Sequence, residues 1–336
     1  GYSRASMYAA RKYLYYLLGA VSLGFLAMIG VLSYSDSTTF VYGGIQALQG
    51  APHTMMLLLF VLGFFGFGVK AAVFPLHGWL PTASVAPTPV TSLLHAVAVV
   101  NAGVFSVGRL AYYVYGPQLI SGTWAQTLCL SMAAFTILFA SARAIHEQHL
   151  KRRLAYSTIS NLSYMLFGLM LLTPLGFRAG LMHMIFHSLI KLTLFSCAGA
   201  IMVRTGRTYV QELRGLYKQM PIVTVVFTFC AVELVGVPPF IVFQSKWALV
   251  TAAFQSGHVV GVIGVVVLLI SAGCTAAYLL KPAVTALALP LDEGKPEKKD
   301  PGWQMLVPFA VLVAAMLALI FAAKPVTDYL SQIAQI

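Results

Sequence analysis

The sequence predicts an all-α, polytopic membrane protein with about nine transmembrane helices, two of them discontinuous. Of the 336 residues, 59% are hydrophobic and only 9% are charged, whereas soluble domains carry roughly 25% charged residues. The mean hydropathy is +0.85. Apolar runs of about twenty residues, the length that crosses a hydrocarbon core, recur along the whole chain. We therefore expect residues 1–336 to form a single transmembrane domain.

Each expected span is an apolar run bounded by polar or turn-forming residues. The spans are predicted near residues 12–33, 54–74, 90–114, 122–145, 154–173, 177–203, 219–254, 258–288 and 303–323. Residues 291–302, LDEGKPEKKDPG, are charged and rich in turn formers. They predict a cytoplasmic linker before the last helix.

Prolines predict where two of these spans are interrupted. The segment 219–254 is too long for one plain helix and contains GVPPF, in which Pro238 and Pro239 break the hydrogen-bond ladder. The second span runs into KAAVFPLHGWLP, where Pro75 predicts a structured loop. Non-helical backbone at membrane depth persists only where protein or water surrounds it. Both breaks are therefore expected inside the helix bundle.

Most basic residues outside the apolar spans fall into four clusters. These are Arg4, Arg11 and Lys12; Lys151, Arg152 and Arg153; Arg204, Arg207, Arg214 and Lys218; and Lys281, Lys295, Lys298 and Lys299. With nine spans, all four clusters fall on one side of the membrane, and the opposite loops hold little more than Arg178 and Lys324. The net charge of +12 therefore follows the positive-inside rule and does not indicate a nucleic-acid partner. It predicts a cytoplasmic N-terminus and an external C-terminus for this chain.

The cysteines give no sign of a metal or cofactor site. Cys129, Cys197, Cys230 and Cys274 are widely spaced, and each falls within an expected span. Their spacing fits neither zinc nor iron–sulfur ligation. We expect them to be packing residues, and we predict no catalytic residue, cofactor or metal for this chain.

Titratable residues inside the apolar spans carry most of the functional information. In LMHMIFHSLIKLTLF, His183, His187 and Lys191 are each four residues apart, so they share one helix face over about 12 Å. Four more such residues occur in other spans. They are Lys70, His95, Glu233 and Lys246. An ionisable group at the bilayer centre costs about 2.5–3.5 kcal/mol, and it usually marks an ion or proton path.

Each of these residues also has a plain structural interpretation. A lone histidine in a membrane is more often a packing residue, and Lys70 could snorkel from a helix end. Lys246 could satisfy carbonyls that the proline break frees, and Glu233 could be a structural partner for a lysine. Together, however, they favour a proton path, because neutral histidines both donate and accept. Glu233 is then the expected counter-charge for Lys191 or Lys246.

Several stretches in this order carry a family resemblance. They are FGVKAAVFPLHGWLPTASVAPTPVTSLLHAVAVVNAGVF, LKRRLAYSTISNLSYM, HMIFHSLIKLTLFSCAG, ELRGLYKQMP and LVGVPPFIVFQSKW. The chain resembles the antiporter-like subunits of respiratory complex I, with their relatives in Mrp antiporters (the D-type subunit) and membrane-bound hydrogenases. The medium-sized complex I subunits are the closer match. The resemblance implies helices six to fourteen of a fourteen-helix fold. The first five are then missing from this sequence, or another chain supplies them.

The resemblance also implies roles for individual residues. Lys70 corresponds to a lysine that pairs with a glutamate on the fifth helix, and His95 to the histidine of the eighth. His183, His187 and Lys191 correspond to the relay of the eleventh helix, with Lys191 as the central lysine. Lys246 corresponds to the residue facing the exit half-channel. Glu233 departs from the family, because many members have a small or polar residue there.

The function that the resemblance implies is proton translocation along the buried lysine and histidine axis. The chain would be a non-catalytic subunit of a redox-driven respiratory complex in a prokaryotic plasma membrane, beside other membrane subunits. One alternative is an Mrp-type Na⁺/H⁺ antiporter subunit with Na⁺ near Glu233. Another is a haem-binding electron carrier using His183 and His187, with His95 as the opposing ligand. A purely structural role is the last alternative.

Overall fold

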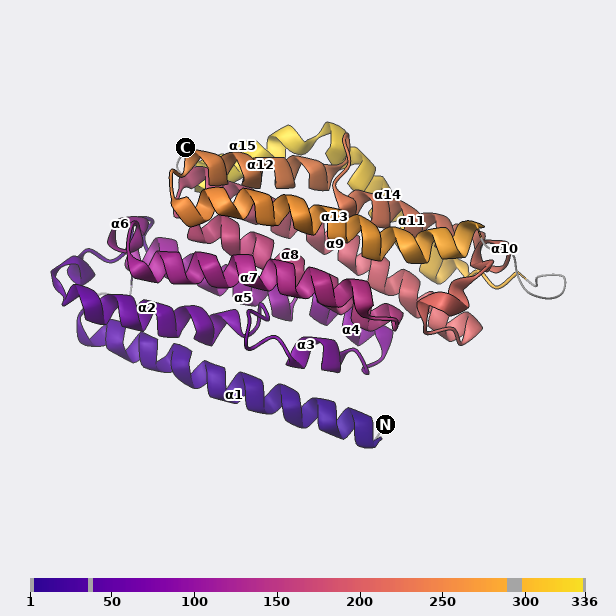
Figure 1. The fold of residues 1–336 in the computed structure, drawn as a ribbon, viewed down its shortest axis with the longest axis horizontal. Coiled ribbons are helices and arrows are strands. Elements are labelled where there is room, and N and C mark those ends of the chain that lie inside the picture. Colours follow the sequence, from indigo (N-terminus) through magenta and orange to yellow (C-terminus); the bar gives the residue numbers. More distant parts are fainter. Residues whose placement is uncertain (1–2, 36–38, 289–297, 335–336) are drawn as a thin grey trace.

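The computed structural model describes residues 3–35, 39–288 and 298–334, and these residues form an elongated bundle of helices (Figure 1). The elements are α1 (Arg4–Ser33), η1 (Gln46–Gly50), α2 (His53–Gly68), α3 (Trp79–Ala83), α4 (Thr88–Ala96), α5 (Val99–Arg109), η2 (Leu110–Tyr115), α6 (Pro117–Ile120), α7 (Trp124–His146), α8 (Leu150–Met170), α9 (Pro174–Thr205), η3 (Val210–Leu213), α10 (Leu216–Gln219), α11 (Pro221–Val235), α12 (Ile241–Gln255), α13 (Val259–Ala288), α14 (Trp303–Phe321) and α15 (Ala323–Ile333). Most long helices run along the long axis of the bundle. α1 lies along one edge, and α14 and α15 lie at the other.

By length and composition, six helices of the described residues can cross a membrane. They are Arg4–Ser33, Thr88–Tyr115, Trp124–His146, Pro174–Thr205, Val259–Leu287 and Trp303–Phe321. His53–Gly68 and Pro221–Val235 are shorter apolar helices. α8 is long but less apolar than these helices, because it contains several serines and an asparagine. Nearly all of its residues, including these polar ones, are buried in the protein interior. The prediction of an all-α polytopic membrane protein is therefore confirmed.

Two expected spans differ from the observed helices. The second span was predicted to reach residue 74, but α2 ends at Gly68, so Lys70 lies in a turn. Ala72 adopts φ +55°, which no α-helix accommodates, and the Trp79 indole donates to the Val69 carbonyl at 2.9 Å. The third span is broken between Ala96 and Val99. No proline or glycine lies at that break, so the sequence pattern did not indicate it.

The break inside the seventh predicted span contains both adjacent prolines. α11 ends at Val235 and α12 begins at Ile241, with Pro238 and Pro239 between them. Gly236 ends α11 in the left-handed region, at φ +83°, a conformation that glycine adopts without a steric penalty. The last carbonyls of α11 therefore lack helical partners and are free to bind other donors.

Residues of two predicted basic clusters, Lys151 and Arg204, lie together at one end of the bundle. The starts of α1, α8 and α14 and the end of α9 contribute to one pocket there, through residues that include Ser3, Lys151, Arg204 and Pro301. The N-terminus and α10 also lie at this end, whereas the C-terminus lies at the other (Figure 1). Of the predicted linker 291–302, residues 291–297 lie outside the described residues.

Gly66 of α2 lies against Gly24 of α1, and this contact gives a test of the packing. A Cβ at Gly66 would meet the backbone of Gly24, within 2.6 Å of its Cα. We expect Gly66→Ala to lower the free energy of unfolding by about 1–3 kcal/mol, the usual cost of overpacking. Gly19→Ala on α1 is the matched control, since nothing lies within 4 Å of its Cβ. Thermal unfolding in detergent measures both, and equal stability of the two variants would contradict this packing.

Candidate functional site

Lys191 lies at the centre of the bundle on α9 and is completely buried. Its Nζ donates to the Leu154 carbonyl at 3.0 Å and to Ser157 Oγ at 2.8 Å, both on α8. α8 packs along α9, and residues 154 and 157 share a face because they are three positions apart. The ammonium is therefore held by neutral oxygen atoms of the neighbouring helix.

His183 joins three helices two turns away from Lys191. Its Nε2 lies 3.1 Å from Asn161 Oδ1 on α8, and its Nδ1 lies 2.9 Å from Ser245 Oγ on α12. Asn161 directs its amide nitrogen to the Ser157 carbonyl, so its Oδ1 accepts from Nε2–H of His183. The Ser245 hydroxyl can donate to Nδ1 or accept from it. His183 is thus bonded at both nitrogens whether it is neutral or charged.

His187 lies on α9 one turn from both Lys191 and His183, and His95 of α4 lies near His187 and Lys191. The ring of His187 lies 6.2 Å from that of His183 between centroids, and it interacts electrostatically with Lys191, His183 and His95. His95, near the end of α4, stacks on Phe195 at 4.6 Å. All four ring nitrogens of His187 and His95 are buried without a hydrogen-bond partner. Such nitrogens remain available to accept or donate a proton.

Lys246 extends the arrangement to the helix break. Its Nζ donates to the carbonyls of Leu234 and Val235, both at 2.9 Å, at the end of α11. These are carbonyls that the break frees, and a helix C-terminus favours a cation. The same Nζ lies 5.5 Å from the ring centroid of Tyr164, and Tyr164 stacks on His183 at 5.5 Å. Lys246 therefore both caps α11 and borders His183.

We call His95, Lys191, His187, His183 and Lys246 the polar row. Its members come from α4, α9 and α12, and α8 supplies the partners Ser157 and Asn161. Each member is at least 90% buried. Burying such groups costs free energy unless they are paired or hydrogen-bonded. His183, Lys191 and Lys246 are hydrogen-bonded, whereas His187 and His95 have no hydrogen-bond partner.

The other two predicted site residues lie outside the polar row. Lys70 follows α2 and packs against Gly103 of α5, and no contact within the described residues joins its side chain to the row. Glu233 is fully buried, yet neither carboxylate oxygen has a hydrogen-bond partner. The Ile241 N–H at the start of α12 acts on it electrostatically without reaching hydrogen-bond geometry.

The expected ion pair of Glu233 with a lysine is therefore wrong for this structure. The ammonium groups of Lys191 and Lys246 are occupied by serine and by backbone carbonyls. Glu233 instead shares its helix face with Cys230, which interacts with Cys197 and Thr193 of α9. Helical geometry fixes the direction of a side chain relative to its own helix, at about 100° per residue. Which neighbouring helix the side chain meets depends on packing that the sequence does not show.

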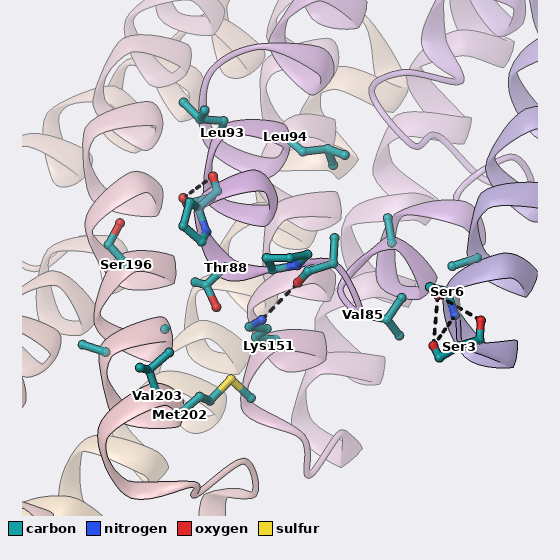
Figure 2. Close-up of a pocket in the computed structure, with 18 of the residues that line it drawn as sticks. Ser3, Ser6, Val85, Thr88, Leu93, Leu94, Lys151, Ser196, Met202 and Val203 are labelled. Atoms are coloured by element: carbon teal, nitrogen blue, oxygen red, sulfur yellow. Dashed lines mark hydrogen bonds between the residues drawn. The ribbon is translucent and has the colours of Figure 1, made fainter. Parts of the chain in front are cut away.

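A pocket of about 1060 Å³ opens at the basic end of the bundle (Figure 2). Lys151 lines it and donates to the Ala86 carbonyl at 3.2 Å, and only 8% of its surface is exposed. Lys151 also interacts electrostatically with His95. Lys151 was predicted to belong to a basic cluster on one side of the membrane, but it lies between the pocket and the polar row.

The neutral residues that bind or stack on members of the polar row, or that bond to such a partner, were not predicted. These are Ser157, Asn161, Tyr164, Ser245 and Tyr278. A signal was present, because residues 157, 161 and 164 recur at three- and four-residue spacing within the span 154–173. That spacing marks one polar helix face.

A family model described as "NADH:quinone oxidoreductase/Mrp antiporter, TM" matches residues 1–271. This chain belongs to that family. The predicted resemblance is thus confirmed.

Curated relatives come from several membrane complexes. NADH-quinone oxidoreductase subunit N of Desulforudis audaxviator is 33% identical over 94% of this chain and 65% of that protein. F(420)H(2) dehydrogenase subunit L of Methanosarcina mazei is 35% identical over 89% of this chain and 44% of that protein. The chain thus spans less than two thirds of the length of both relatives.

Solved structures share the fold over nearly the whole chain. The archaeal membrane-bound sulfane sulfur reductase has a chain with TM-score 0.85 and 24% identity, covering 100% of this chain and 67% of that one. The Mrp complex from Dietzia sp. has one with TM-score 0.84 and 22% identity, covering 99% and 68%. Respiratory complex I from Thermus thermophilus has one with TM-score 0.76 and 24% identity, covering 97% and 69%. The chain therefore has the antiporter-like fold found in these multi-subunit complexes.

Proposed function

We propose that this chain is a proton-translocating subunit of a redox-driven membrane complex of the complex I type. The observation that carries the proposal is the polar row itself, in which two buried histidines lie between the amino groups of Lys191 and Lys246. A charge at one position changes the proton affinity of the next through Coulomb interaction, which is strong in a low-dielectric interior. Stepwise proton movement along the row follows from this coupling.

The proposed topology has nine membrane crossings, with α2 and the broken helices α4–α5 and α11–α12 each completing one. The basic end faces the cytoplasm, in line with the positive-inside rule, and the membrane is the plasma membrane of a prokaryote. The pocket at Lys151 then opens toward the cytoplasm. Other membrane subunits supply the electron transfer. Lys70 would pair with a glutamate on the family's fifth helix, as the resemblance implies.

The second candidate function is a subunit of an Mrp-type Na⁺/H⁺ antiporter, and Glu233 favours it. A buried carboxylate without a hydrogen-bond partner suits either a proton or a hard cation that prefers oxygen ligands.

The haem alternative has less support, because both nitrogens of His183 are bonded to Asn161 and Ser245.

Sealed vesicles that contain the intact native complex distinguish the two functions. Acidification that requires an electron donor and does not depend on Na⁺ supports the redox-driven subunit. Na⁺-dependent exchange under an imposed pH gradient, without any donor, would instead establish the antiporter.

Glu233→Gln gives a separate prediction. The substitution keeps the shape of the side chain but removes its titration and its charge. We expect the pH dependence or the ion preference of translocation to change, because the buried carboxyl group no longer exchanges a proton or binds a cation. Asp328→Asn is the matched control, since Asp328 is exposed on α15. If both variants keep the wild-type pH profile and ion preference, Glu233 has only a structural role.

A further inference from the structure

Lys191 contacts a chain of buried hydroxyl groups that runs away from the histidines. Ser157 Oγ, which holds the Lys191 ammonium, lies 3.0 Å from the Tyr278 hydroxyl of α13. The Tyr278 hydroxyl lies 3.1 Å from Thr275 Oγ1, and Thr275 donates to the Ser271 carbonyl at 2.8 Å. The side chains of Ser157, Tyr278 and Thr275 are all at most 1% exposed. A fully buried polar chain of this length is costly unless each member is bonded.

The position of Tyr278 is fixed by a second buried contact. Arg153 of α8 donates through Nη1 to the Tyr278 carbonyl at 3.0 Å. This bond holds the Tyr278 turn of α13 against α8, one helical turn from Ser157. The hydroxyl chain therefore rests on a rigid contact between two helices rather than on a mobile loop.

The Ser157 hydroxyl has one hydrogen, so it has two arrangements. When Lys191 is an ammonium, Ser157 Oγ accepts from it and from the Tyr278 hydroxyl, and Thr275 donates to the Ser271 carbonyl. When Lys191 is a neutral amine, Tyr278 still donates to Ser157, and Ser157 donates to the amine lone pair. The two arrangements differ only by rotation of the Ser157 O–H bond, and no covalent bond forms or breaks in the chain.

We propose that Ser157, which is held by the Tyr278 hydroxyl, is a positioning residue that replaces a carboxylate counter-ion for Lys191 by reorienting its hydroxyl group with the charge. This inference rests on the proposed translocating function. A carboxylate would bind the ammonium strongly and resist its deprotonation. Reorienting hydroxyls bind both forms, so Lys191 can lose and regain its proton in a dry interior.

The groups around Lys191 agree with this assignment. The titratable residues that interact with it are His187 on α9 and His95 on α4, and Tyr278 of α13 reaches it through Ser157. On α8, Arg153 is directed to backbone carbonyls. Neither Glu233 of α11 nor Lys246 of α12 bonds to its ammonium. Within the described residues, therefore, no carboxylate binds the ammonium of Lys191.

Tyr278→Phe tests the proposal in vesicles containing the intact complex. The variant removes the hydroxyl that donates to Ser157 Oγ and competes there with the Lys191 ammonium. We expect the pH above which translocation falls to half to move up by roughly 0.5–1 unit, the size expected for one net hydrogen bond. Tyr112→Phe is the matched control, because Tyr112 is equally buried and its hydroxyl donates to the Leu169 carbonyl, away from the polar row.

A second pair of variants covers the case in which Tyr278→Phe does not assemble. Ser157→Ala removes the oxygen that accepts from the Lys191 ammonium, so it should move the pH profile down, and Ser157→Thr, which keeps the hydroxyl, should leave it unchanged. Profiles that match Tyr112→Phe in both Tyr278→Phe and Ser157→Ala would overturn the proposal.

Lys191→Met, measured alongside, separates the proposed translocating function from the proposed role of the hydroxyl chain. If it translocates normally, the proposed function fails, whereas loss in Lys191→Met with unchanged Tyr278→Phe refutes only the hydroxyl chain.

Discussion

Lys191→Met is expected to abolish translocation through this chain while the complex still assembles. Methionine fills a similar volume but carries no proton, so the polar row loses the group that joins His187 to His95. The fold should tolerate the change, because replacing a buried charge by an apolar side chain of similar volume is often neutral or stabilising. Ser157 then loses one hydrogen-bond partner but keeps Tyr278.

Acidification of sealed vesicles, with native electrophoresis of the same membranes, measures both parts of this prediction. We expect the rate of vesicle acidification to fall at least tenfold, which corresponds to an increase of about 1.4 kcal/mol or more in the activation barrier for proton translocation. Lys218→Met is the matched control, since Lys218 is exposed on α10. An assembled Lys191→Met complex that translocates at the wild-type rate would remove Lys191 from the mechanism.

Arg153→Met is expected to have the largest effect on stability. Arg153 is completely buried, and its guanidinium donates to the carbonyls of Glu147, Ile145 and Tyr278 at 2.8, 3.3 and 3.0 Å. These bonds tie the α7–α8 connection to α13. Removing the guanidinium leaves three buried carbonyls without this donor, at about 1–3 kcal/mol for each group that stays unsatisfied.

The expected loss of stability is therefore about 3–5 kcal/mol, comparable to breaking a buried ionic contact. The adjacent Arg152→Met is the control, because Arg152 is exposed. Thermal unfolding in detergent and the amount of protein in membranes measure the difference. Similar stability of the two variants would show that the Arg153 contacts carry little energy.

The membrane class and family could be predicted because they depend on signals local to the sequence. Long apolar runs and adjacent prolines can be recognised directly in the sequence, and Pro238 and Pro239 lie in the break between α11 and α12. The stripe of His183, His187 and Lys191 follows from helical spacing alone. The structure keeps these three residues on one helix, and every one of them is fully buried.

The remaining features depend on contacts between helices. The break at residues 97–98 has apolar residues on both sides, so its hydropathy is that of a continuous helix. The early end of α2 depends on the Trp79 indole binding the Val69 carbonyl. Tyr278 meets Ser157 across 121 positions of sequence, and no local pattern links them. For the same reason the direction of Glu233 could not be predicted.

The number of protons moved per electron, compared between wild-type and Lys191→Met complexes, tests the central claim most directly. Donor consumption and acidification are recorded together in the same sealed vesicles. The polar row predicts that electron transfer continues in the variant while the proton-to-electron ratio falls, because the step carried by this chain is lost. An unchanged ratio in a fully assembled Lys191→Met complex would contradict the claim that protons cross the membrane along this row.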